Sequence, residues 1–534
     1  MTPDVAVLVL LVGAGTVLAG LLPGFRFTGA LAALTALLAL VAVLLMGFWL
    51  PAAYTLAEWP GGALRLAAEP RSWLFALAYL VALFGLQLSG AVRSGGRRVA
   101  VRFCSLLVAA AGVAAIFAAD LLALAVAWAA LDLATFALGL AGNEAHAPGP
   151  AGVTPNTMRL ALNFAALAAL LVAALGAPQA AGLALGSALL PERTIAWLWI
   201  AAALRLHLVP LHLGGHPGGG EQRGKAALLL LAPLAGTTLL LAALATRPPN
   251  AALAAVLSAA ALASALFGSW LFYCKPDDAD ALGNLGVAFA GLVVLVALHA
   301  GSAAAPGVML LGVMAIITSA TLFTYMGFAR SDAVWVAAPV LAAAIMAGLP
   351  LTVGFAMVRT VAAGMLSNSA PWWLLLFLVA LMLMAAGTLR QALRPGAAPN
   401  WSEPFTSTAY LFGLGAPLAF AVAVGSAPDA LGRMLGTADG TTQPAANLLA
   451  VGCVLLVSGA ALVLWHLRPV LAGWTRRWLG APEFPGWQSL YAGAWQGYRS
   501  SGRTLRVAAA VLEGDGGVLW MLVGALLAVL LVEL

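Results

Sequence analysis

The chain has 534 residues, of which 63% are hydrophobic and only 8% are charged. A soluble domain of this length cannot bury so much apolar surface, so the composition excludes a soluble enzyme and predicts a membrane protein. The net charge of +6 could indicate an acidic partner, but it also fits basic residues gathered on cytoplasmic loops, and nothing resembles a nucleic-acid-binding module. Three cysteines, Cys104, Cys274 and Cys453, lack ligand spacing and argue against a disulfide framework, a zinc site or an iron–sulfur cluster.

Apolar runs, broken by glycine, proline and charge, predict an all-α polytopic membrane protein with about sixteen transmembrane helices. The first run begins after Asp4 without a basic start or a small-residue cleavage site, so we expect a helix there and not a signal peptide. The expected spans lie near 5–22, 28–50, 73–92, 101–119, 121–141, 158–176, 194–210, 226–246, 251–273, 281–300, 306–328, 334–366, 373–393, 408–427, 446–466 and 517–533.

Basic residues are distributed unevenly over the loops between these spans. If the N-terminus is outside, 18 of the 25 basic residues fall on cytoplasmic loops and five on outer loops. This positive-inside bias predicts that both termini lie outside a bacterial-type cytoplasmic (inner) membrane. Between the last two spans, Trp487, Tyr491, Trp495 and Tyr498 share one helix face, which indicates an interfacial anchor or a partner-docking helix.

Spans four to eight and nine to thirteen form two sets of five helices, and the fourth helix of each set contains a proline, Pro210 or Pro350. An odd number of helices per set inverts the second copy, as in inverted-repeat transporters, whose sites lie at broken helices near the midplane. Unrelated proline kinks are the alternative, because such kinks are common in membrane helices. The expected organisation is 1–98 with helices 1–3, 99–248 and 249–396 with the two repeats, 397–467 with helices 14–15, and 468–534 with the interfacial segment and the last helix.

Two charges fall inside predicted spans of the first repeat, Asp132 in span five and Arg205 five residues before Pro210. Each would cost about 2.5–3.5 kcal/mol at a bilayer centre, so we expect the two to face the protein interior and to pair. The pair is interpreted either as part of a transport site or as a structural clamp between two helices.

Two histidines, His207 and His212, flank the expected break at Pro210 and are candidates for a proton relay, or else satisfied core residues. Arg359 follows Pro350 and is a candidate for the ion path, although its side chain could also extend to an interface. Nucleotide, nucleophile and metal motifs are absent from the sequence, so we expect no catalytic residue, cofactor or metal.

These residues resemble the antiporter-like membrane subunits of respiratory complex I (subunits L, M and N), cation/proton antiporter complexes and membrane-bound hydrogenases. The matching motifs are Arg205 with Val209-Pro210-Leu211-His212, Gly348-Leu349-Pro350-Leu351 with Gly354-Phe355, Asp120-Leu-Leu with Trp128, and the tail Leu512–Trp520. The resemblance covers roughly residues 70–395. It implies a non-redox subunit, without cofactor, of a proton-translocating respiratory complex such as an NADH-quinone oxidoreductase, with other membrane subunits as its partners.

The chain departs from the family pattern at the ionisable positions. The family glutamate after Trp128 is Ala129, with Asp132 three residues on, and the family lysine of span seven is Arg205. The charged residue that the family carries in span eight is missing, and the His/Lys pattern of span eleven is replaced by residues 318–325. The basic pair that opens span ten in the family is replaced by acidic residues at 277–280. In span twelve, Arg359 lies one position beyond the charged position of the family. A buried lysine can release its proton, whereas arginine stays protonated, so Arg205 is expected to act only as a fixed charge.

The residues support three hypotheses. The first is a subunit of a complex I-like or antiporter-like assembly that moves protons or cations near Asp132, Arg205, His207 and His212. The second is a degenerate scaffold subunit that spaces or seals neighbouring pumps. The third is the membrane partner of an inorganic-carbon uptake complex.

Overall fold

The structure of the chain, a computed structural model, describes residues 2–19, 27–59, 62–93, 99–141, 155–176, 190–211, 247–275, 278–325, 333–394, 404–435 and 444–478, with 237–238, 240–241 and 244. The chain divides into two units, Met1–Leu467 and Arg468–Leu534. The second unit is described only over its first residues, so the predicted interfacial helix and last span lie outside the described residues.

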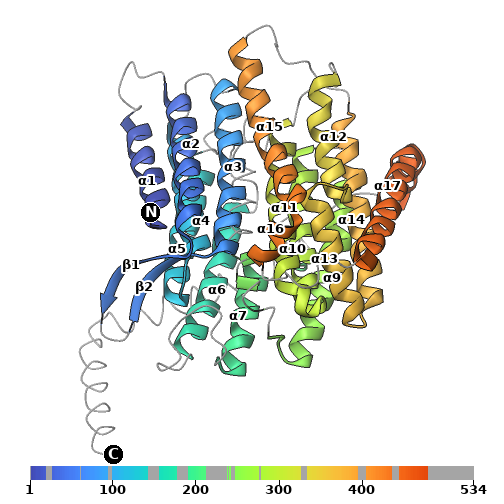
Figure 1. The fold of residues 1–534 in the computed structure, drawn as a ribbon, viewed down its shortest axis with the longest axis horizontal. Coiled ribbons are helices and arrows are strands. Elements are labelled where there is room, and N and C mark those ends of the chain that lie inside the picture. The colour runs from blue at the N-terminus through green and yellow to red at the C-terminus, as the bar shows by residue number, and fades with distance from the viewer. Residues whose placement is uncertain are drawn as a thin grey trace, which may run out of the picture. The chain divides into compact units, whose positions relative to one another are not determined.

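Helices make up nearly all of the first unit (Figure 1). Its elements, in chain order, are α1 (Asp4–Leu18), α2 (Thr28–Met46), β1 (Ala52–Trp59), β2 (Gly62–Ala68), α3 (Pro70–Arg93), α4 (Val99–Phe117), α5 (Leu121–Leu140), α6 (Pro155–Leu175), α7 (Glu192–Arg205), α9 (Ala251–Cys274), α10 (Asp278–His299), α11 (Ala304–Tyr325), α12 (Ala333–Ala347), α13 (Val353–Ser367), α14 (Pro371–Ala392), α15 (Pro404–Ser426), α16 (Pro428–Leu435) and α17 (Pro444–Trp478), which runs on into the second unit. Short 3₁₀ turns follow α2 (Gly47–Trp49) and α10 (Gly301–Ala303).

The expected all-α polytopic fold class is confirmed. Among the described residues, ten helices are long and apolar enough to cross a membrane, and four shorter apolar helices accompany them. Exposed leucines and valines line α2 and α17, whereas the span of α11 is completely buried. The number sixteen is not established, since the predicted spans at 226–246 and 517–533 lie mostly or wholly outside the described residues.

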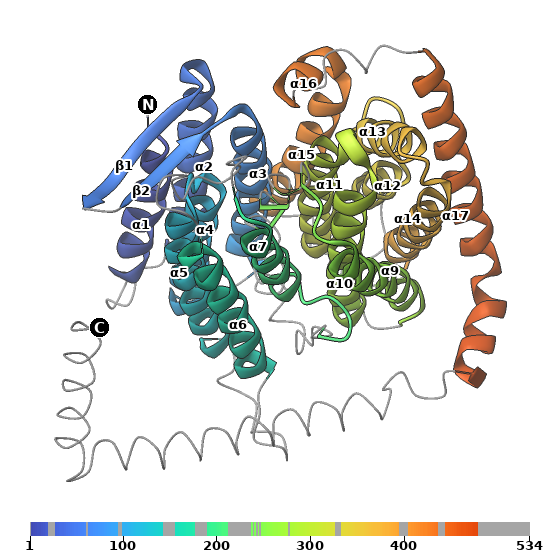
Figure 2. The same ribbon diagram turned by 90° about the horizontal axis from the view of Figure 1, so that it is seen from below.

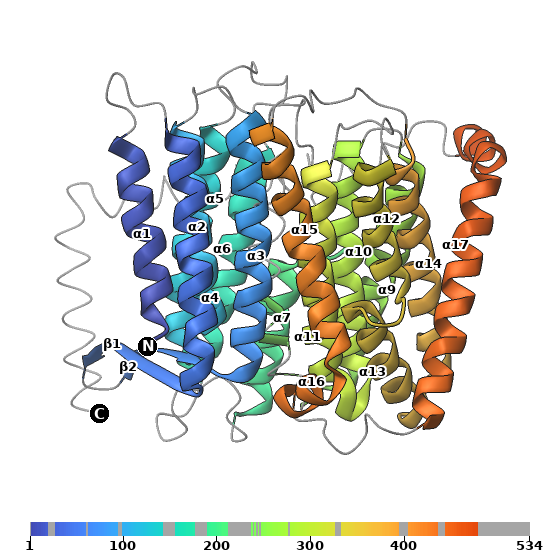
Figure 3. The same ribbon diagram turned by 45° about the horizontal axis from the view of Figure 1, so that its top comes forward.

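The central helix is α11, which packs against α3, α10, α12, α13 and α15 (Figure 3). It carries no charged residue, and two of its threonine hydroxyls bond within the helix. Thr318 and Thr321 donate to the carbonyl oxygens of Met314 and Ile317 at 2.7 and 2.9 Å. The centre of the unit is therefore held mainly by apolar packing, and these two hydroxyls are satisfied by backbone groups of their own helix.

A β-hairpin replaces the loop that we expected between the second and third spans. β1 and β2 pair antiparallel, with Tyr54 opposite Leu66 and Thr55 opposite Arg65. Leu66 and Ala68 are buried while Arg65 is exposed, which is the alternation of a strand with one covered face. The hydrophobic-run search missed this hairpin because it detects apolar runs of membrane-spanning length and not short alternating segments.

Asp120 connects this hairpin to the first repeat. As the N-cap of α5, its Oδ1 accepts from the backbone N–H of Ala123 at 2.6 Å, and its Oδ2 accepts from the backbone N–H of Arg65 at 2.9 Å. A second link runs from Ala119 N to Arg65 O at 3.0 Å. One carboxylate thus starts a helix and anchors a strand.

Both expected helix breaks are present, and they end with the same hydrogen-bond pattern. After α7, His207 N donates to Leu204 O and Leu208 N donates to Ala203 O. After α12, Gly348 N and Leu349 N make the equivalent bonds to Ile345 O and Ala344 O. His207 and Gly348 both have positive φ, 51° and 82°, as this type of helix end requires.

The position of the first break differs from our expectation. α7 ends at Arg205, so the chain leaves the helix before Pro210, which lies exposed in the loop. The left-handed residue ends the helix, and the proline only prevents its continuation. The second break contains Pro350 itself, and α13 restarts with Thr352 as its N-cap. The inverted relation of the two repeats stays a prediction, because most of span eight lies outside the described residues.

We expect Asp120→Ala to lower the free energy of unfolding by about 0.5–2 kcal/mol, because the helix cap is lost. Thermal unfolding of the detergent-solubilised chain measures the effect. Asp120→Asn is the matched control, since an asparagine caps a helix as well as an aspartate does. An equal loss of stability in both variants would contradict this assignment to the cap, because the asparagine can still accept from Ala123 N–H but no longer from Arg65 N–H as well.

Candidate functional site

An ion pair deep inside the first unit joins α5 to the end of α7. Arg205 Nη1 and Asp132 Oδ1 are 2.6 Å apart, and both side chains are completely buried. The pairing expected from the sequence is thereby confirmed. Two charges withdrawn from solvent require each other, since removing either one leaves the other uncompensated.

The arginine is also covered by an aromatic ring. Its guanidinium carbon lies 4.9 Å from the centre of the Trp128 ring, a cation–π contact. Trp128 precedes Asp132 by four residues on α5, so both face α7 from the same side of one helix. Trp128, which matches the family motif, and Asp132, which is displaced from it, thus both contact the guanidinium of Arg205.

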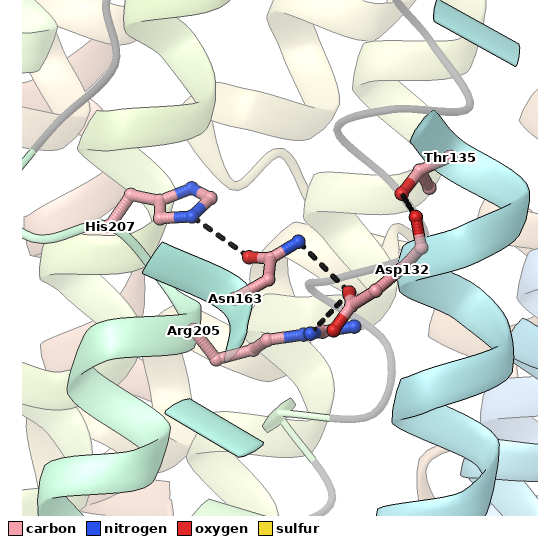
Figure 4. A network of polar contacts seen from close by, with 5 residues as sticks. All are labelled: Asp132, Thr135, Asn163, Arg205 and His207. Atoms are coloured by element: carbon pink, nitrogen blue, oxygen red, sulfur yellow. Dashed lines mark hydrogen bonds and ion pairs between the residues drawn. The ribbon is translucent and has the colours of Figure 1, made fainter. Parts of the chain in front are cut away.

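Asn163 of α6 extends the ion pair into a chain of polar groups (Figure 4). Its Nδ2 donates to Asp132 Oδ1 at 2.9 Å, and its Oδ1 lies 3.0 Å from Nε2 of His207. Three helices, α5, α6 and α7, therefore contribute to one file, Arg205–Asp132–Asn163–His207. Of these helices, α6 packs against both α5 and α7 (Figure 2).

Sequence reasoning missed Asn163. The signal was a lone amide within the apolar run 160–175, four residues after Arg159 and so on the same helix face. Asn163 is 2% exposed, and a buried amide needs hydrogen-bond partners. A search for uncharged polar residues within spans could have found it.

The loop after α7 reaches the second set of helices. The backbone N–H of Val209 donates to Ser264 Oγ of α9 at 2.8 Å, and that hydroxyl donates to Ala260 O at 2.7 Å. The loop residue next to Pro210 is therefore held by a helix of the other set. This bond couples the broken end of α7 to α9.

The ion pair retains hydrogen-bonding capacity. Within the described part of the chain, Asp132 Oδ2, Arg205 Nε and Nη2, and Trp128 Nε1 are buried without a hydrogen-bond partner. Such groups are rare in protein interiors because each costs free energy. They make this the most polar and least satisfied location among the buried helices described.

Two other candidates do not join this network. Arg359 of α13, 8% exposed, donates from Nη1 to Asn447 Oδ1 of α17 at 3.3 Å, and none of the hydrogen bonds of Asp132 involves it. His212 lies outside the described residues. The structure thus brings together Asp132, Arg205 and His207, with Pro210 three residues beyond the histidine.

A second polar cluster, also missed, lies where α9, α10, α13 and α14 meet. His299 Nε2 is 2.9 Å from Ser258 Oγ, and the imidazole stacks on Trp373 with ring centres 4.0 Å apart. Asn368 donates to the His299 carbonyl oxygen at 3.2 Å. This cluster contains no acidic group, and it ties helix ends together.

Fold and site together define a multi-pass helical membrane protein with a buried charge pair beside a broken helix. Solved structures with this fold include a chain of the Mrp complex from Dietzia sp. DQ12-45-1b, with a TM-score of 0.76 and 20% identity. They also include a chain of the membrane-bound sulfane sulfur reductase, an archaeal respiratory membrane complex (TM-score 0.71, 15% identity), and one of respiratory complex I from Thermus thermophilus with bound NADH (TM-score 0.65, 21% identity).

The matches cover 100%, 99% and 85% of this chain respectively. The chain spans 63% of the length of the Mrp chain and 100% of the other two. At these identities the comparisons establish the fold, which is the one that the resemblance to antiporter-like subunits predicts. No family model matches the sequence, and no curated protein matches it.

We expect a double-mutant cycle to reveal the dependence of the two buried charges on each other. Asp132→Leu and Arg205→Met should each lower the free energy of unfolding by about 3–5 kcal/mol, because each leaves one buried charge unpaired. The double variant should unfold close to wild type. Chemical unfolding in detergent measures all four proteins, and additive losses would contradict the assigned pairing.

Proposed function

We propose that this chain is an antiporter-like integral membrane subunit of a complex I-like respiratory or ion-translocating assembly, and that it contributes to proton (or cation) translocation. The observation that carries the proposal is the buried file Arg205–Asp132–Asn163–His207 at the broken end of α7. Ionisable residues inside membrane helices are costly and mark ion paths and proton relays. Broken helices near the midplane are where transporters place their sites.

The roles of the residues follow from their chemistry. Arg205 stays protonated and supplies a fixed positive charge, so Asp132 and His207 are the two groups of the file that can exchange protons. A proton arriving on Asp132 neutralises the carboxylate and leaves the charge of Arg205 uncompensated in a dry environment. Proton arrival is therefore coupled to a displacement of the Arg205 side chain or to the approach of another anion.

Two lines of reasoning support this function. The fold is shared with chains of the Mrp complex, the sulfane sulfur reductase and complex I, all multi-subunit membrane complexes. The sequence motifs around Arg205 and Pro350 resemble those of the antiporter-like subunits. The partners of the chain are then other membrane subunits, in a bacterial-type inner membrane with both termini outside, as the loop charges indicate.

A specific observation favours a second function, that of a non-pumping scaffold. Thr318 and Thr321 of α11 donate to carbonyl oxygens of their own helix, and Arg359 donates to Asn447 of α17, so these polar side chains of the second set of helices do not form a file like that at Asp132. A subunit with only one polar half could space or seal neighbouring pumps. An assembly for inorganic-carbon uptake is compatible with either role, and the proteins that co-purify with the chain distinguish these assemblies.

We expect Asp132→Asn to abolish proton translocation by the purified complex in proteoliposomes, measured with a pH-sensitive dye inside the vesicles. The asparagine keeps the size of the side chain and a hydrogen-bond acceptor but cannot carry the proton. Asp120→Asn, another buried carboxylate in the same repeat, is the control and should translocate normally.

The scaffold function predicts a different outcome for the same pair of variants. Asp132→Asn would then leave translocation per assembled complex unchanged and would reduce only the amount of complex that assembles. Blue-native electrophoresis measures assembly separately from the proton signal. Unchanged translocation with reduced assembly would rule out the transport role of Asp132.

A further inference from the structure

We propose that Asn163 is a positioning residue that bridges Asp132 and His207 by one hydrogen bond to each, while preventing proton transfer between them. The proposal rests on the proposed function, because insulation matters only where protons move. Asn163 lies on α6, and neither the motifs nor the charges of the sequence point to it.

The orientation of the Asn163 amide is determined by its neighbours. Its Nδ2 donates to Asp132 Oδ1 at 2.9 Å, and Asp132 is held as a carboxylate by Arg205 at 2.6 Å. A flipped amide would place its carbonyl oxygen against the carboxylate, where two acceptors repel. The amide oxygen must therefore face His207.

This orientation in turn determines the tautomer of His207. Asn163 Oδ1 is only an acceptor, so the contact of 3.0 Å with Nε2 requires a proton on that nitrogen. The neutral imidazole is then protonated at Nε2 and bare at Nδ1. Asp132 thus controls, through one amide, which ring nitrogen of His207 can accept an incoming proton.

An amide cannot relay that proton onward at low cost. Transfer from His207 Nε2 to Asn163 Oδ1, with release of an Nδ2 proton to Asp132, balances the charges but leaves the amide as its imidic-acid form. The amide must then be regenerated before a second proton can pass. A carboxyl group or a water molecule has no such cost, because its oxygens accept and donate interchangeably.

The surrounding structure keeps the amide in place. Asn163 is 2% exposed, and the backbone of His207 is fixed in the left-handed conformation by the helix end, with φ at 51°. Val209, two residues on, is held by Ser264 of α9 at 2.8 Å. The contact between Asn163 Oδ1 and His207 Nε2 is therefore held by α6 on one side and by the loop after α7 on the other. We expect it to open when α6 and this loop move apart. In this sense Asn163 is a gate between Asp132 and His207, the two groups that can exchange protons.

Asn163→Asp tests the gate, because a carboxyl group at this position completes the relay between His207 and Asp132. In proteoliposomes with an imposed pH gradient and no driving reaction, we expect the passive proton leak to rise at least about tenfold, a conservative figure for a positioned acid–base group. Asn284→Asp is the matched control, since Asn284 of α10 is also 2% exposed, and it should leave the leak unchanged. A wild-type leak in a correctly assembled Asn163→Asp complex would overturn the proposal.

A second measurement does not depend on translocation or on that variant. Nitrogen NMR of the full-length chain, labelled with ¹⁵N-histidine in lipid, reports the tautomer of each of the six histidines, and His207→Gln assigns the signal. We expect a proton on Nε2 of His207 in wild type and a mixed population in Asn163→Leu. A neutral imidazole protonated at Nδ1 in wild type would overturn the proposal, even if Asp132→Asn abolishes translocation as expected. A different result is also informative: His207 has a mixed tautomer in Asn163→Leu, but Asp132→Asn leaves proton translocation unchanged. That result would reject the proposed function, while it would still support the hydrogen bond between Asn163 and His207.

Discussion

The structure depends on the compensation of charge where solvent is absent. Arg205 and Asp132 are both completely buried, and each is tolerated only because the other lies 2.6 Å away. The ring of Trp128 and the amide of Asn163 contribute further contacts to the same two groups. This requirement fixes how α5, α6 and α7 face one another, because four side chains on three helices must meet at one location.

The two broken helices show how the chain uses its backbone near this location. Both breaks have the same pair of terminal hydrogen bonds and a left-handed residue, which is Gly348 in the second repeat and His207 in the first. Glycine adopts this conformation without a steric penalty, whereas a histidine there is strained. His207 keeps this strained backbone, and its imidazole contacts Asn163 in the polar file. The strain at this position therefore points to a role for the imidazole in the site.

The buried charges of the described helices have different kinds of partner. Asp132 of α5 and Arg205 of α7 form a buried ion pair, while Thr318 and Thr321 of α11 donate to carbonyl oxygens of their own helix. Arg390 of α14, 2% exposed, donates to the Lys275 and Phe272 carbonyl oxygens at the end of α9 and so serves as a helix cap. Arg390 thus secures a helix end, whereas Asp132 and Arg205 compensate each other inside the fold.

The sequence alone determined the membrane class, the approximate position of most helices and the presence of both breaks, since these depend on local hydrophobicity and on proline and glycine. The predicted span at 281–300 corresponds to α10, and that at 373–393 to α14. Pairing of Asp132 with Arg205 could also be inferred from the sequence, because two isolated opposite charges in an apolar repeat have few other partners.

Only the tertiary structure decided which uncharged groups complete the site. Asn163 lies 31 residues from Asp132 and 44 from His207, and Ser264 lies 55 from Val209, so no local pattern encodes these contacts. It also bonded Arg359 of α13 to Asn447 of α17, ended α7 at Arg205 and formed a hairpin where we expected a loop. Hydrophobic periodicity reports whether a segment is buried, whereas the partner of a buried polar group depends on how distant helices pack.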